Sequence, residues 1–83
     1  MPYIKQYDRP KLDAALRFVE PLLNVGELNY IITVLCKKYI QDHGESYQHY
    51  NDIIGVLECA KMEFYRRKIA PYEDIKILSN GDV

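Results

Sequence analysis

Apolar side chains recur at steps of three and four residues along most of this chain, which is the spacing of one face of an α-helix. The stripes are Leu12, Ala15, Leu16, Val19 and Leu23, then Leu28, Ile31, Ile32, Leu35, Tyr39 and Ile40, then Tyr50, Ile53, Ile54, Leu57, Ala60 and Phe64. A β-branched run at 31–34 resembles a strand, but the longer helical period outweighs it. We therefore predict a single all-α domain over residues 1–83. It should be a small bundle of two long antiparallel helices, a shorter N-terminal helix and a short C-terminal helix.

Residues that begin and end helices set the boundaries of the first two. The first helix should begin at Pro10 with Asp8 as its cap, because proline is tolerated in the first turn. This helix should run to about residue 19 or residue 23, and Pro21 should either kink it or end it near residue 20. After a break in which Gly26 is free to take a positive φ, the second helix should run over 27–43.

The third helix is expected to be the longest. A loop with Gly44 as the stop of the preceding helix leads to Ser46, which should cap the third helix. Ala70-Pro71 should end it, because the residue before a proline disfavours the helical conformation. A short fourth helix should then begin at Pro71, reach Leu78 and stop at Asn80-Gly81.

The small size of the chain predicts a need for partners. A domain of 83 residues buries only about 60% of its unfolded surface, so it is marginal as a monomer. Disulfides, a metal or partner subunits usually compensate. Cys36 and Cys59 are the only cysteines, and each sits in a helical segment with bulky apolar neighbours, so we expect two buried free thiols rather than a disulfide or metal ligands. Because no cofactor or metal is expected either, we predict a homo-oligomer.

Charge and hydropathy exclude several classes of protein. With 11 basic and 12 acidic residues, the chain lacks the broad positive surface that drives binding to extended nucleic acid. No apolar run approaches the roughly 20 residues that a transmembrane helix needs. The opening residues 1–5 lack the apolar core of a signal peptide. We therefore expect a cytoplasmic protein with no membrane contact.

Few residues are suited to catalysis. No G-x-S-x-G, P-loop, H-E-x-x-H or paired C-x-x-C motif is present. Pairing of a cysteine with His43 or His49 would need a thiol in an open electropositive site, whereas both thiols look buried. The same two histidines, near Asp42 and Glu45, offer a metal site as the alternative to a solvated polar turn. We expect no enzymatic activity and assign no catalytic or metal-binding residue.

The strongest cationic cluster lies at the end of the third helix and has aromatic neighbours. Guanidinium groups suit phosphate or carboxylate, and an aromatic ring beside arginine can hold a nucleobase. A small anionic ligand needs only two or three cations, so the near-neutral net charge does not exclude one. The candidate ligand-binding residues are Arg66, Arg67, Lys68, Tyr65 and Tyr72. The alternative is a charged helix end that interacts with the helix dipole and with Glu63, Glu73 and Asp74.

Tyrosine is unusually frequent, with eight residues against two phenylalanines and no tryptophan. Tyrosine combines a large contact area with a polar tip and is favoured at interfaces. So many rings cannot all fit inside a core of this size. We predict that some of the tyrosines line a subunit interface or a ligand pocket, and we assign Tyr3, Tyr7, Tyr30 and Tyr50 to the interface. An interior glycine, Gly55, suggests close approach of a second helix or of a ligand.

Four segments resemble one family of short proteins encoded by bacteriophages and bacteria, which often open with the same MPYI. They are 26–33 (GELNYIIT), 54–67 (IGVLECAKMEFYRR), 70–74 (APYED) and 80–83 (NGDV), so the resemblance extends over nearly the whole chain. No activity or site is assigned to that family. The resemblance implies a phage accessory protein in the host cytoplasm, of the kind that blocks a host protein or sequesters a host defence signal.

Two functions follow as expectations. The first is a non-enzymatic, homo-oligomeric binding protein that sequesters a small anionic, nucleotide-like signalling ligand through the cationic cluster. The second is a protein-interaction module that inhibits or adapts a host protein through a tyrosine-rich face.

Overall fold

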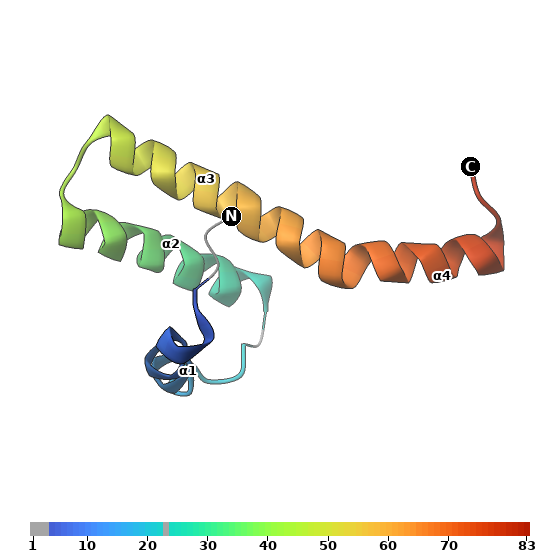
Figure 1. The fold of residues 1–83 in the computed structure, drawn as a ribbon, viewed down its shortest axis with the longest axis horizontal. Coiled ribbons are helices and arrows are strands. Elements are labelled where there is room, and N and C mark those ends of the chain that lie inside the picture. Colours follow the sequence, from blue (N-terminus) through green and yellow to red (C-terminus); the bar gives the residue numbers. More distant parts are fainter. Residues whose placement is uncertain (1–3, 23) are drawn as a thin grey trace. The chain divides into compact units, whose positions relative to one another are not determined.

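The computed structural model describes residues 4–22 and 24–83, which form helices joined by short loops and contain no strand (Figure 1). The chain divides into two units, Met1–His43 and Gly44–Val83. The first contains a 3-10 turn (Gln6–Asp8), α1 (Pro10–Leu16) and α2 (Val25–His43), and the second contains α3 (Tyr47–Phe64), a π-helical turn (Tyr65–Ile69) and α4 (Ala70–Asn80). The all-α prediction is confirmed, whereas the antiparallel packing of the two long helices stays a prediction.

Helix α1 is shorter than its apolar stripe predicts, and it begins differently. Asp8 belongs to the preceding 3-10 turn, so Arg9 takes the N-cap position without a side-chain cap. The carbonyl of Arg9 instead accepts from the N–H of Leu12 at 3.0 Å. After Leu16 the backbone tightens to bonds between residues three apart, such as Val19 N–H to the Leu16 carbonyl at 3.0 Å. The predicted extension of the helix beyond Leu16 is therefore wrong, because the backbone there forms turns closed by bonds between residues three apart instead of continuing the α-helix.

Helix α2 begins two residues earlier than predicted. Oδ1 of Asn24 accepts from the backbone N–H of Glu27 at 2.9 Å, which satisfies one of the unpaired donors of the first turn. Gly26 lies inside this turn and does not have the positive φ that was expected. A Cβ at Gly26 would lie 3.1 Å from Oδ1 of Asn24, so the glycine leaves room for the cap.

The residues between α2 and α3 behave as the sequence predicts. Gly44 has φ +90°, a conformation that glycine adopts without a steric penalty. Ser46 caps α3, and its Oγ accepts from the backbone N–H of His49 at 3.0 Å. At the end of α2, the ring of His43 stacks on that of Tyr39 with centroids 4.1 Å apart.

The predicted break at Ala70-Pro71 is wrong, because α3, the π turn and α4 form one continuous helical ribbon (Figure 1). Proline lacks an N–H, and its ring clashes with the carbonyl four residues earlier, which is that of Arg67. Just before Pro71 the hydrogen bonding widens, and the N–H of Ala70 bonds to the carbonyl of Tyr65, five residues back. The π turn thus moves the carbonyls relative to the ring and lets the helix pass a proline. As predicted, Gly81 ends α4, with φ +86°.

No side chain in the described ranges is fully buried, and most large apolar side chains are exposed. Cys36 and Cys59 are free but only half-buried, so the expectation of full burial is wrong. At Gly55, a Cβ would meet no other atom within 4 Å in the described chain, and the close approach of a second helix or of a ligand stays a prediction. Along residues 4–22 and 24–83 the apolar stripes remain available to other surfaces.

Candidate functional site

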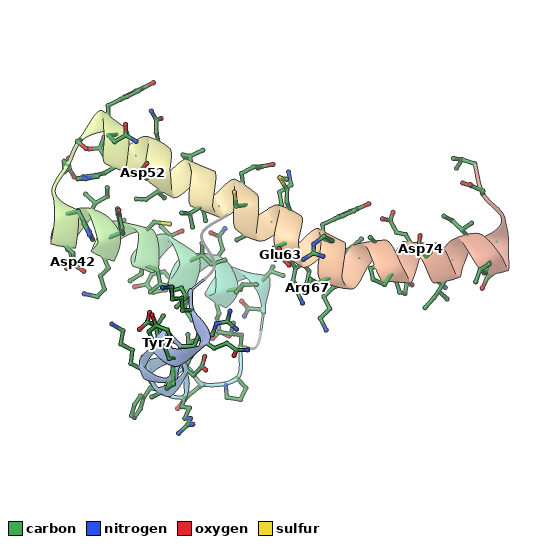
Figure 2. All side chains as sticks on the ribbon, in the orientation of Figure 1. Tyr7, Asp42, Asp52, Glu63, Arg67 and Asp74 are labelled. Carbon is green, nitrogen blue, oxygen red and sulfur yellow. The ribbon has the colours of Figure 1, made fainter. Side chains whose placement is uncertain are left out.

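The cationic cluster predicted from the sequence occupies the π turn. Arg66 and Arg67 both reach back to one carboxylate oxygen, Oε1 of Glu63 on α3. Figure 2 labels Glu63 and Arg67 close together on the ribbon. The Arg66 Nη2 donates at 2.7 Å and the Arg67 Nε at 2.6 Å. These spacings of three and four residues are those at which helix side chains meet. The two guanidinium groups therefore converge on a single point of negative charge.

Glu63 sets the electrostatics of this cluster. Its side chain is 25% exposed, whereas the two arginine side chains that cover it are more than 60% exposed. Ion pairs at such spacings stabilise a helix by only about 0.3–0.5 kcal/mol each. An external anion can therefore compete for the same guanidinium groups at modest cost. Lys68, the third cation, makes no ion pair with any described residue.

Tyr65 and Glu73 form a second link across the π turn. The Tyr65 phenol donates a hydrogen bond to Oε1 of Glu73, from one side of Pro71 to the other. This bond to a carboxylate, followed by the negative charge of Glu73 and then desolvation, raises the pKa of Tyr65 above its usual value. The phenol is thus held in its neutral, donating form.

Tyr72 lies on α4, one turn beyond the cationic cluster. Its ring is 59% exposed, and Nζ of Lys76 lies 5.5 Å from the ring centroid, within the range of a cation–π contact. The structure thus brings Arg66 and Arg67 together on Glu63, but it links Tyr65 to Glu73 and places Tyr72 beside Lys76. The contacts with Glu63 and Glu73 are those that the helix-end alternative expected.

The predicted interface tyrosines differ in their surroundings. Tyr7 and Tyr30 are 74% and 71% exposed, whereas Tyr3 lies outside the described residues. Tyr50 donates to Oε2 of Glu45 at 2.8 Å, and this hydrogen bond is the main cause that raises its pKa. Tyr7 and Tyr30 therefore present the larger free ring surface, and Tyr50 contributes to the start of α3.

A groove in the first unit was not anticipated from the sequence. Its volume is about 920 Å³, and most of its wall is apolar. The lining residues include Phe18, Val19, Pro21, Leu22, Tyr30 and Ile31, with the carboxylates of Glu20 and Glu27 among them. The groove arises because α1 ends early and the chain turns at 17–22 before α2. The sequence did not predict this turn, because the helical spacing of apolar residues continues to residue 23 although the helix ends at Leu16.

Two further properties concern the described ranges. They contain no group of three or more histidine, cysteine, aspartate or glutamate side chains placed to hold a metal ion. None of their helices combines the length and the apolar character needed to cross a membrane.

Comparison with known proteins gives one match. A family model described as a domain of unknown function, DUF6899, matches residues 1–83. No curated protein and no solved structure matches the chain.

Proposed function

The chain belongs to the DUF6899 family, and from its residues we propose a non-enzymatic binding protein that works as a homo-oligomer and takes up a small anionic ligand. The observation that carries this proposal is the convergence of Arg66 and Arg67 on one carboxylate oxygen in the exposed π turn. π turns occur frequently at functional sites. The exposed apolar stripes support the self-assembly, because a small chain in which none of the described side chains is fully buried needs further apolar contacts.

The ligand class follows from the groups around the cluster. Two guanidinium groups present planar donors that fit phosphate or carboxylate oxygens, and Lys68 adds a third charge. The exposed ring of Tyr72 offers a face on which a base can stack. A nucleotide-like signal combines these features, which fits an accessory protein of phage type that sequesters a host defence signal.

Binding can be tested by thermal shift against a panel of linear and cyclic nucleotides, together with native mass spectrometry of protein purified from cells. One nucleotide should raise the melting temperature of the wild type by about 10–20 °C when it is present at 100-fold its Kd. Arg66→Ala and Arg67→Ala should remove the shift. Arg17→Ala, which removes an arginine outside the cluster, is the matched control. Absence of a shift with every nucleotide would remove this ligand class.

A second candidate function is supported by the groove of the first unit. Its apolar wall, with Tyr30 and Phe18 both largely exposed, fits an apolar side chain of another protein. In this function the chain inhibits or adapts a host protein. Tyr30→Ala should then abolish capture of one specific host protein, whereas Tyr47→Ala, at an exposed tyrosine of α3, should not. Equal capture by both variants would argue against the groove.

A further inference from the structure

The second unit carries an apolar stripe, formed by Tyr50, Ile53, Ile54, Leu57, Ala60 and Phe64 and continued by Ile69 and Tyr72. The helices of the first unit are too short to cover the whole of this stripe. We use "long helix" for the continuous run of α3, the π turn and α4, which have 18, 5 and 11 residues. At about 1.5 Å per residue, the long helix spans about 50 Å, against about 28 Å for α2 and about 10 Å for α1. Even if α1 and α2 were placed end to end, their combined length would be shorter than the long helix, so part of its apolar stripe would stay exposed.

The π turn keeps the stripe on one side of the long helix. Phe64 and Ile69 are five residues apart, and π-helical hydrogen bonds join residues at that separation. In a regular α-helix, a residue five positions further on would lie about 140° around the axis. The π turn therefore aligns the stripe of α3, which ends at Phe64, with Ile69 and Tyr72. All three side chains are exposed, Phe64 by 61%.

Charged residues beside this stripe form a repeated pattern. Glu58 precedes Lys61 by three residues, and Glu73 precedes Lys76 by three residues. Each lies near the stripe or its flank, because Glu58 pairs with Lys61 at 3.3 Å, Glu73 accepts from Tyr65 and Lys76 lies over Tyr72. Read along the helix, the order is negative, positive, negative, positive.

We infer that the stripe is an interface with a second copy of this chain, in which two long helices pair antiparallel about an axis near Arg67. In this register, Glu58 lies opposite Lys76 of the second copy. Because both pairs have the same spacing, Lys61 then lies opposite Glu73, and the two-fold symmetry makes each contact twice. A parallel, in-register pair would instead place like charges together.

The same register matches apolar residues across the axis. Tyr65 lies opposite Ile69 of the second copy, and the two-fold symmetry makes this contact twice. Arg67 itself, at the level of the axis, is held by Glu63 of its own chain at 2.6 Å. The charges and apolar residues of one long helix match those of a second, reversed copy. Binding of a different protein to this stripe would not require such a match, and we therefore favour the second copy.

This inference rests on the proposed self-assembly, and charge reversal tests it separately. Sedimentation velocity of the full chain should show an assembled species at micromolar concentration, above the monomer mass of 9.8 kDa. Lys61→Glu and Glu73→Lys should each weaken assembly about tenfold, because each places like charges opposite one another twice. The double variant restores opposite charges and should return the Kd to within about threefold of the wild type.

Destabilisation of the helix within one chain would not produce the rescue expected for the double variant. Lys61→Glu also loses its contact with Glu58, but Glu73→Lys cannot repair that contact within one chain, so only pairing between copies predicts rescue. The matched control is the reversal of an exposed pair on α2, Lys38→Glu with Asp42→Lys, which should leave assembly unchanged.

The remaining outcomes separate the two proposals. A wild type that stays at 9.8 kDa at every concentration overturns both self-assembly and this interface. An assembled wild type whose single variants assemble normally, or whose double variant is the weakest of all, overturns the interface and leaves self-assembly standing.

Discussion

The phenol of Tyr65 donates a hydrogen bond to the carboxylate of Glu73, and this contact links the π turn to α4 on the far side of Pro71. The link matters because proline cannot donate the backbone bond that would otherwise hold α4 to the preceding turn. The Tyr65–Glu73 side-chain contact thus lies where a backbone hydrogen bond of the long helix is missing.

Replacement of Tyr65 tests this link through its pH dependence. The raised pKa means that the folded state binds the phenolic proton more tightly than the unfolded state does. The stabilisation is therefore complete below the usual tyrosine pKa of 10.0 and is lost as the pH rises through the higher folded value. Tyr65→Phe should lower the melting temperature at pH 7 and flatten its decline above pH 10. Tyr47→Phe is the control, and identical alkaline profiles for both variants would contradict the link.

Replacement of Pro71 tests the origin of the π turn. Pro71→Ala restores a backbone N–H and removes the ring, so the helix should become more stable by about 1–3 kcal/mol. Urea unfolding followed by circular dichroism measures this change. Pro21→Ala, outside any helix, should change stability far less. A loss of stability in Pro71→Ala would show that the π turn has another cause.

Replacement of Ser46 tests the cap of α3. Because Oγ of Ser46 satisfies the N–H of His49, Ser46→Ala should destabilise the protein by about 1 kcal/mol. Ser79 bonds weakly to the Ile75 carbonyl at 3.4 Å and is exposed, so Ser79→Ala should change stability by less than about 0.5 kcal/mol. Equal effects in denaturant unfolding would contradict the role of the cap.

Replacement of Gly55 asks whether its missing side chain has a use. Within the described chain there is open space at this position, so Gly55→Ala should stabilise α3 by about 0.5–1 kcal/mol. Thermal unfolding and sedimentation should be measured together. A variant that is more stable but assembles less would place another chain or a ligand against the Gly55 backbone.

The elements that the sequence predicted well are those set by local chemistry. Ser46, Gly44 and Gly81 act through their own backbone or through a side-chain oxygen within three residues, so their roles can be read directly from the sequence. The predicted break at Pro71 failed for a different reason. A proline normally ends a helix, but a widened turn placed just before it relieves the clash, and no residue pattern in 65–69 announces such a turn.

In the candidate site, too, some features could be predicted from local sequence and others depend on the geometry of the folded chain. The cluster of Arg66, Arg67 and Lys68 and its acidic neighbour Glu63 are visible in the sequence at helical spacing. The contacts of both arginines with Glu63 need only helical spacing, whereas the contact of Tyr65 with Glu73, eight residues further on, depends on the rotation that the π turn introduces. The groove beside Tyr30 was missed because it depends on how the chain turns after Leu16, where the apolar pattern continues but the helix does not.

The π turn also makes the number of residues in this segment a property of the fold. Deletion of one residue within 65–69 would allow a regular α-helix in which Phe64 and Tyr72 are seven positions apart, about 20° from alignment around the axis. Loss of the π turn without a deletion would instead leave them eight positions apart and separate them by about 80°. Related chains that have one residue fewer in this segment should therefore lack the π turn and keep the stripe on one side.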